Sequence, residues 1–260
     1  MLVNVRYDQA LLDSAKKFVN ENRNKILEIY DTRDKKTKEI LSFILRARAE
    51  GRYAFYEYTT VAGMQNTEGY FYEGELSHLD AFTFADCGAY TGDTFESIYG
   101  MYAGKLKKYY AYEPSEKNFE RLKRNAASLV NDVTCICVQK AIGDFNKMVT
   151  MGKCDGDFGV LDGADSREDT ELVEMVSLDS EQIRPEGKLV IKIDAEGAEM
   201  DILRGAVHTI RKYSPYMAVC VYHRVSDILK LPEFFIEQGL SYRFLLRSGI
   251  HTHLLAIPME

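Results

Sequence analysis

The amino-acid sequence predicts an α/β fold with a mostly parallel sheet, preceded by a helical N-terminal extension. Strand-like and helix-like patterns alternate from about residue 81 onward, which calls for parallel strands joined by helices. The last two strand-like runs are separated only by residues 247–251, which is too short for a parallel crossover. The chain should therefore finish with an antiparallel pair. Helical spacing of apolar residues between residues 8 and 50 predicts the extension.

The elements after residue 80 can be placed from their apolar patterns. Strands are expected near residues 81–86, 108–112, 133–138, 188–193, 216–222, 241–246 and 252–257, and helices near 92–102, 115–129, 197–212 and 225–238. Residues 144–180 are irregular and acidic, which predicts a loop: either a lid near a substrate or a plain surface loop.

This pattern predicts that the chain is divided into two parts. We expect a helical and tyrosine-rich extension over residues 1–80 and a Rossmann-like domain over residues 81–260. Residues 52–80, rich in Tyr, Phe and Gly, predict short strands and loops. The extension would either cover the mouth of a site or make dimer contacts, and in the second case the protein is a homo-oligomer.

Composition narrows the class of protein. The net charge of −7 and the pI near 5.4 argue against nucleic acid as an electrostatically held partner. The five cysteines include no C-x-x-C pair, and an odd number fits a reducing compartment. Cys135 and Cys137 alternate to one face of a strand, where we expect small buried hydrophobes rather than a metal site. Since no signal-peptide core and no membrane-length apolar run occurs, we expect a cytoplasmic protein without a membrane partner.

The most informative stretch runs from Phe82 to Thr94. An apolar run ends there in Asp86, and a turn with Gly88 and Gly92 precedes a helix start, which is typical of a nucleotide-type site at the carboxyl end of a strand. Glycine lets the backbone turn sharply and approach a ligand closely. The next strand-like run ends in Glu113, 21 residues after Gly92, where an acid usually binds a ribose diol.

The charges around this turn indicate which cofactor to expect. A dinucleotide site normally shows G-x-G-x-x-G, but here the spacing is Gly88-x-x-x-Gly92, and the carboxylates of Asp86 and Asp93 would repel a pyrophosphate. S-adenosylmethionine fits better, because its ammonium group needs a carboxylate and its ribose needs Glu113. A parallel sheet that ends in an antiparallel hairpin is the layout of class I methyltransferases, which supports the same choice.

A second group of polar residues follows the strand of residues 188–193. Asp194 and Glu196 come at its carboxyl end, and His223 ends the next strand-like run, so the three should reach the same rim. One of them would serve as general base for a hydroxyl acceptor. The two acids could instead share a divalent metal, which the sequence does not predict, or simply cap the following helix. Lys192 shares a face with Asp194 and would pair with it.

Five motifs together resemble the FkbM family of methyltransferases, in family order from about residue 80 to 245. They are Asp86-x-Gly88-Ala89-x-x-Gly92-Asp93, Tyr112-Glu113-Pro114-Ser115, Ala141-Ile142-Gly143-Asp144, Ser177-Leu178-Asp179 and Lys192-Ile193-Asp194-Ala195-Glu196-Gly197-Ala198-Glu199. The resemblance implies a Rossmann-like S-adenosylmethionine fold and, usually, O-methylation of sugar or polyketide hydroxyls. It also implies that Gly88, Glu113 and the turn of residues 141–144 hold the cofactor. Cys87, Tyr90 and Thr91 depart from the usual glycine loop, and residues 1–80 lie outside the resemblance.

The sequence therefore predicts an S-adenosylmethionine-dependent O-methyltransferase that acts on a sugar, a nucleotide sugar or a related small molecule. Its predicted catalytic residues are His223, Asp194 and Glu196. Its predicted cofactor-binding residues are Asp86, Gly88, Ala89, Gly92, Thr94, Glu113, Ala141, Ile142 and Asp194. A nicotinamide-dependent oxidoreductase and a non-catalytic cofactor-binding domain are the alternatives.

Overall fold

The computed structural model describes residues 9–51, 69–71, 74–129, 132–154, 157–160, 170–248 and 251–259. The chain divides into two compact units, Glu68–Val219 and the pair of segments Met1–Thr67 and Cys220–Glu260. This division differs from the single cut at residue 80 that the sequence suggests, and the two-domain organisation stays a prediction. Within the described ranges, no helix combines the length and the apolar character that crossing a bilayer requires.

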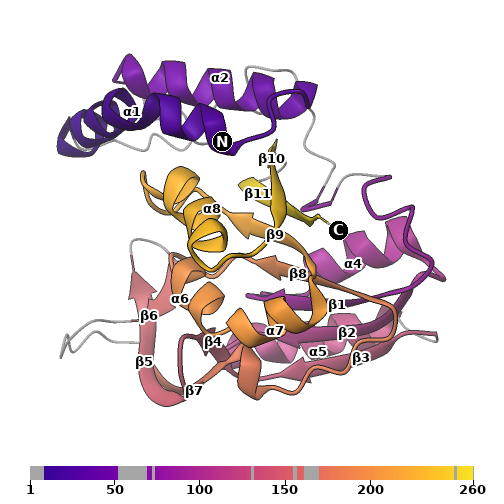
Figure 1. The fold of residues 1–260 in the computed structure, drawn as a ribbon. Helices are drawn as coiled ribbons and strands as arrows, with labels where there is room; N and C mark the ends of the chain where they lie inside the picture. Colours follow the sequence, from indigo (N-terminus) through magenta and orange to yellow (C-terminus); the bar gives the residue numbers. More distant parts are fainter. Residues whose placement is uncertain are drawn as a thin grey trace. The chain divides into compact units, whose positions relative to one another are not determined.

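The unit that contains both termini is built from helices and one β-hairpin. Its elements are α1 (Gln9–Ile29), α2 (Lys35–Ala49), α8 (Asp227–Glu237), β10 (Tyr242–Ser248) and β11 (Thr252–Pro258). The helices α1 and α2 run side by side, and β10 pairs antiparallel with β11 (Figure 1). The expected N-terminal helices and the antiparallel C-terminal strands are therefore both present.

Polar contacts tie the N-terminal helices to that hairpin. Asp34 caps α2 by accepting a hydrogen bond from Thr37 N over 2.7 Å, and the same carboxylate accepts from Arg247 of β10 over 2.8 Å. The hydroxyl of Thr37 accepts from Leu246 N over 3.0 Å. Because Thr37 and Arg247 are buried, these bonds fix α2 against β10.

The other unit is organised around a parallel sheet. Its strands are β1 (Phe82–Cys87), β2 (Leu106–Tyr112), β3 (Thr134–Val138), β8 (Lys188–Ile193) and β9 (Tyr216–Cys220), in the spatial order β9-β8-β1-β2-β3. All their pairings are parallel (Figure 1). Every residue of β1 is buried, as expected for a central strand covered on both faces. The carboxyl ends of β1, β2, β8 and β9 thus meet at one edge of the sheet.

The helices of this unit are α4 (Asp93–Tyr102), α5 (Glu116–Leu129), α6 (Glu199–Arg204) and α7 (Val207–Tyr213). The prediction of a single helix over residues 197–212 is wrong, because the helix is interrupted between α6 and α7. A Cβ on Gly205 would lie 2.0 Å from the carbonyl oxygen of Gly143, so only glycine allows this close approach. The carboxylate of Asp179 then caps α7 by accepting from His208 N and Thr209 N over 2.9 and 2.7 Å.

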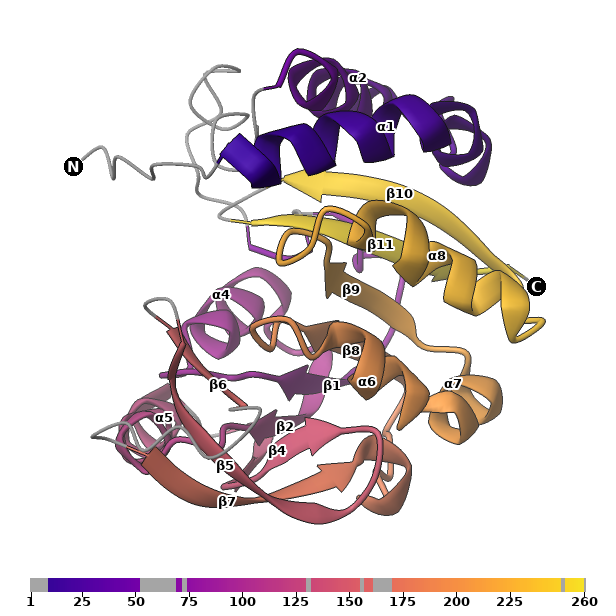
Figure 2. The ribbon, with the colours of Figure 1, turned by 90° about the vertical axis from the view of Figure 1, so that its left-hand side faces the viewer.

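A second sheet replaces most of the loop expected over residues 144–180. It contains β4 (Ala141–Gly143), β5 (Lys147–Cys154), β6 (Asp157–Val160) and β7 (Thr170–Ser177), in the order β4-β7-β5-β6 (Figure 2). The expectation of an irregular segment is wrong because an alternating pattern underlies the acidic residues. Val149 and Met151 are buried against Val173 and Met175, while Leu172 is exposed. Residues 155–156 and 161–169 lie outside the described residues.

Other expectations concern single segments. The remaining predicted strands agree with the observed ones to within two residues at each end. The strands and loops expected over residues 52–80 fall largely on residues 52–68 and 72–73, which lie outside the described ranges. Cys135 and Cys137 share a face of β3, as the alternation predicts, with 3.8 Å between their sulfur atoms. Both thiols are half-buried rather than fully buried.

Candidate functional site

The turn after β1 is held against the end of β8. Gly88 has a φ of +90°, and a Cβ at this position would lie 2.0 Å from the carbonyl oxygen of Asp194. The amides of Gly88 and Ala89 both donate to the carbonyl of Tyr112 at the end of β2, over 3.1 and 2.9 Å. Glycine is required at 88 because two backbones meet there. The space that a Cβ would need is filled by the backbone of Asp194, directly after β8, and the expected contact of Gly88 with a cofactor stays a prediction.

The second glycine starts the helix that follows. Gly92 has a φ of +92° and is the N-cap residue of α4, so no side chain of the cap residue covers the first turn of this helix. The ring of Tyr90 is exposed, and its backbone φ is +47°. Asp93 is exposed in the first turn, whereas Thr94 is buried with 6% of its surface accessible. The exposed part of the turn thus includes Tyr90 and Asp93 but not Thr94, whose contact with a cofactor stays a prediction.

Glu113 lies at the end of β2, directly beside this turn. Its Oε2 accepts from Tyr90 N over 2.9 Å, and its Oε1 accepts from Ser115 N over 3.0 Å and from Asn118 Nδ2 over 3.5 Å. Only 6% of the residue is exposed. Burial raises the pKa of Glu113 to about 7, against the lowering effect of these hydrogen bonds. The carboxyl is therefore placed firmly at the turn and titrates near neutral pH.

Asp86, by contrast, has no exposed surface. Its Oδ1 lies 2.9 Å from Nζ of Lys192, and its Oδ2 accepts from the hydroxyl of Tyr109 over 2.5 Å. Burial raises the pKa of Asp86, and the charge of Lys192 opposes that rise. Both carboxylate oxygens of Asp86 thus face protein partners in the interior, and the expected contact with the methionine end of a cofactor stays a prediction.

Lys192 likewise has a different partner from the one expected. Asp86 and Lys192 stand opposite each other in the register of β1 and β8, so the lysine pairs across the sheet rather than with Asp194. Its Nζ also donates to the carbonyl of Gly88 over 2.5 Å and lies 4.9 Å from the ring centroid of Tyr70. One buried cation therefore links β1, β8, the glycine turn and Tyr70.

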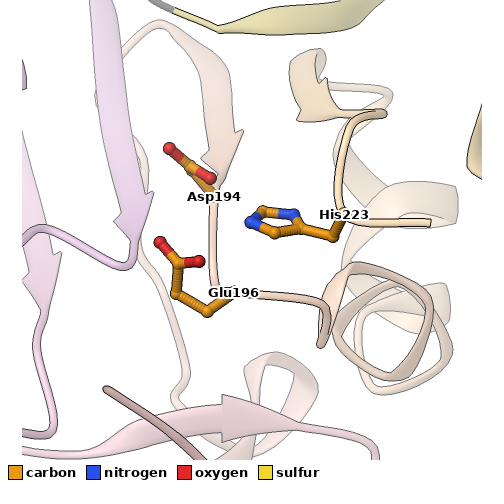
Figure 3. Close-up of side chains that lie close together, drawn as sticks. All are labelled: Asp194, Glu196 and His223. Atoms are coloured by element: carbon orange, nitrogen blue, oxygen red, sulfur yellow. The ribbon is translucent and has the colours of Figure 1, made fainter. Parts of the chain in front are cut away.

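Asp194 and Glu196 follow β8 directly, and Figure 3 draws them with His223. Asp194 is half-buried, its amide donates to the carbonyl of Cys87 over 3.1 Å, and its Oδ2 accepts from the hydroxyl of Tyr70 over 2.5 Å. Glu196 is exposed and has a φ of +50°, which is uncommon for a residue with a side chain. Both carboxylates thus lie at the carboxyl edge of the parallel sheet, next to the glycine turn.

Glu199 shapes the loop that carries these acids. Only 1% of Glu199 is exposed, and its Oε1 accepts from Ala195 N over 3.1 Å and from Gly197 N over 3.3 Å. Gly197 has a φ of +93°, so the loop needs glycine there. The acid in the first turn of α6 could have suggested a cap, since carboxylates are favoured at helix starts.

The remaining predicted residues divide into two cases. Ala141 and Ile142 lie in β4 of the second sheet, where each is 6% exposed and Ala141 packs in a cluster with Met175. Their side chains thus serve that sheet. His223 lies three residues after the end of β9, and the centroid of its ring is 3.7 Å from that of Tyr222. It belongs to the unit of Cys220–Glu260, and its grouping with Asp194 and Glu196 stays a prediction.

A family comparison can now be added to this geometry. The model of the methyltransferase FkbM domain matches residues 86–244, well over half of the chain. The chain belongs to the FkbM methyltransferase family. The match begins at Asp86 and includes the glycine turn, Glu113 and the loop after β8. Tyr70 and both N-terminal helices precede the matched FkbM region.

One solved structure agrees with the FkbM assignment at the level of the fold. The methyltransferase FkbM from Methylobacillus flagellatus KT matches with a TM-score of 0.70 and 21% identity, over 93% of this chain and 60% of that chain. This chain thus spans less than two thirds of that FkbM protein. The precorrin-6y C5,15-methyltransferase from Geobacter metallireducens GS-15 matches with a TM-score of 0.41, 11% identity and coverages of 71% and 84%. Aeropyrum pernix fibrillarin, solved with natively bound S-adenosyl-L-methionine, matches with a TM-score of 0.40 and 11% identity, over 69% of this chain and 67% of that chain. No curated protein matches significantly.

Proposed function

We propose that the protein is an S-adenosylmethionine-dependent methyltransferase that methylates a hydroxyl group of a sugar, a nucleotide sugar or a related small molecule. The observation that carries the proposal is the position of Glu113 at the end of β2, bonded to Tyr90 N of the glycine turn. An ionised acid in this place can accept a hydrogen bond from a ribose hydroxyl. The FkbM family membership supports the same cofactor.

The residues present fit that cofactor at its ribose and at its charged centre. In its ionised form, Glu113 keeps acceptor capacity at Oε2 beyond its bond to Tyr90 N, because each carboxylate oxygen can accept twice, whereas Oε1 already accepts from Ser115 N and Asn118 Nδ2. When bound, the cofactor would supply an electrophilic methyl group on a positively charged sulfur. The carboxylate of Asp194, which follows Ile193 beside the turn, would favour such a charge.

The acceptor hydroxyl needs a group that takes its proton as it attacks. We assign this role to His223 and an orienting role to Asp194 and Glu196. The register of β8 and β9 pairs Ile193 with Val219, so His223 leaves the strand next to the one that delivers the acids. A positioned base typically contributes about 10²–10⁴-fold to the rate.

A radiometric screen tests the proposal. The purified full chain would be incubated with methyl-labelled S-adenosylmethionine and a panel of free sugars, glycosides and nucleotide sugars. Transfer of label to a sugar hydroxyl supports the proposal. Label on a nitrogen or carbon atom, or hydride transfer with NAD in place of methyl transfer, would contradict it. Repeating the active reaction with EDTA, then with added Mg²⁺, decides whether a divalent ion takes part.

A further inference from the structure

Tyr70 precedes the region that the family model matches, yet it reaches the loop after β8. Its hydroxyl donates to Oδ2 of Asp194 over 2.5 Å, which is the distance of a strong charge-assisted bond. The matched region begins only at residue 86. A residue from outside this region therefore holds one of the two carboxylates at the edge of the parallel sheet.

The residues on either side of Tyr70 anchor it. Phe71 is fully buried and meets Phe84 of β1 edge to face, with ring centroids 6.0 Å apart. A Cβ on Gly69 would lie 3.0 Å from the hydroxyl oxygen of Ser97 in α4, so the backbone passes close to that helix. Tyr70 thus stands between two fixed points rather than on a free strand of chain.

Lys192 holds the ring of Tyr70 from the interior. Its Nζ lies 4.9 Å from the ring centroid, within the range of a cation–π contact, and is itself fixed by Asp86 and by the carbonyl of Gly88. Only 2% of Lys192 is exposed, so water screens this contact little. The ring therefore has a defined orientation from which its hydroxyl meets Asp194.

We propose that Tyr70 is a positioning residue, which holds the Asp194 carboxylate toward the charged centre of the cofactor. This inference rests on the proposed function. A hydrogen bond to one carboxylate oxygen restricts rotation of the group. Because the backbone of Asp194 is bonded to Cys87, next to the glycine turn, its carboxylate is well placed to act on a cation bound there.

Two cofactor analogues separate this role from a merely structural one. Sinefungin carries a protonated amine where S-adenosylmethionine carries its methylated sulfur, whereas S-adenosylhomocysteine has an uncharged sulfur. The ratio of their affinities, measured by calorimetry on the full chain, reports how strongly a carboxylate of the protein stabilises the positive charge of the sinefungin amine. In Tyr70→Phe we expect sinefungin affinity to fall about five- to tenfold, with S-adenosylhomocysteine affinity within about twofold of the original value.

Tyr99→Phe is the matched control, because the hydroxyl of Tyr99 also donates to a carboxylate, Asp132, but on the exposed surface. It should leave both affinities unchanged. If Tyr70 acts through Asp194, Asp194→Asn and the double variant Tyr70→Phe/Asp194→Asn should have the same affinity ratio.

An unchanged ratio in Tyr70→Phe, or a further loss in the double variant, would overturn the positioning role while leaving the methyltransferase proposal intact. Failure of the unmodified chain to bind either analogue would instead contradict the proposed function itself.

Discussion

Asp86 and Lys192 form an ion pair in the interior of the parallel sheet, with 2.9 Å between the carboxylate Oδ1 and the lysine Nζ. The two residues stand opposite each other on β1 and β8, and their side chains are 0% and 3% exposed. Since neither charge meets water, each depends on the other for compensation.

Removing only one member of this ion pair should destabilise the fold strongly. We expect Lys192→Met to lower the free energy of unfolding by about 3–5 kcal/mol, because it leaves the Asp86 carboxylate buried without its cation. Adding Asp86→Asn should recover part of that loss. Urea denaturation measures both. Asp201→Asn is the control, because it breaks an exposed pair with Arg204 and should cost less than about 1 kcal/mol. Equal losses in Lys192→Met and Asp201→Asn would contradict the account.

Glu113 should make cofactor binding depend on pH. Its pKa is raised to about 7, and the ionised carboxylate is the better acceptor for ribose hydroxyls. Lowering the pH from about 8 to 6 should therefore weaken S-adenosylhomocysteine binding roughly tenfold, since the ionised fraction falls by about that factor. Calorimetry at several pH values checks this. In Glu113→Gln the affinity should be lower and nearly independent of pH, and a parallel slope in that variant would exclude Glu113 as the titrating group.

The same shift predicts how stability changes with pH when no cofactor is bound. The pKa of Glu113 lies above its usual value of 4.5 in the folded chain, so the folded state binds more protons than the unfolded state between about pH 4.5 and 7. The contribution of Glu113 to the free energy of unfolding thus decreases as pH rises through this window, by up to about 3 kcal/mol. Thermal midpoints at a series of pH values should fall less steeply in Glu113→Gln than in the unmodified chain.

Gly88→Ala should disturb the fold itself. A Cβ would meet the carbonyl oxygen of Asp194 at 2.0 Å, so β1 and β8 must move apart, and we expect a loss above about 3 kcal/mol. Gly104→Ala is the control, because Gly104 has a similar φ of +83° but nothing within 4 Å of the added atom. It should cost about 1 kcal/mol, from the backbone conformation alone. Similar denaturation midpoints for the two variants would show that the close approach is not required.

His223→Ala, Asp194→Asn and Glu196→Gln test the assignment of the acceptor centre. With the acceptor found by the radiometric screen, we expect at least His223→Ala to lower kcat by about 10²–10⁴-fold while S-adenosylhomocysteine still binds. The exposed His208 on α7 provides a matched histidine, and His208→Ala should retain normal kcat. Near-normal kcat in all three variants of the predicted centre would remove these residues from the mechanism.

The fold was largely predictable because its central strands are mostly apolar runs between turn residues, interrupted only by a few polar side chains. Phe82–Cys87 and Lys188–Ile193 were placed correctly for this reason, as was the hairpin after Leu240. The second sheet was missed because its strands alternate buried residues such as Val173 with exposed ones such as Leu172. Acidic residues in the linking segments concealed that alternation.

The site was predictable in its strand-end positions but not in its partners. The placement of Glu113 and Asp194 after strands follows from the sequence pattern alone. The pairing of Lys192 with Asp86 depends on the register between β1 and β8, which a local pattern does not contain. The bond from Tyr70 to Asp194 joins residues 124 positions apart, so no spacing in the sequence indicates it.

The most direct test of the account is calorimetric titration of the full chain with S-adenosylmethionine and, separately, with NAD. We predict saturable binding of S-adenosylmethionine, no binding of NAD, and a loss of affinity in Glu113→Ala of about ten- to a hundredfold, from the removed charge-assisted bonds. Binding of NAD, or unchanged S-adenosylmethionine affinity in a folded Glu113→Ala variant, would contradict the assignment of this site.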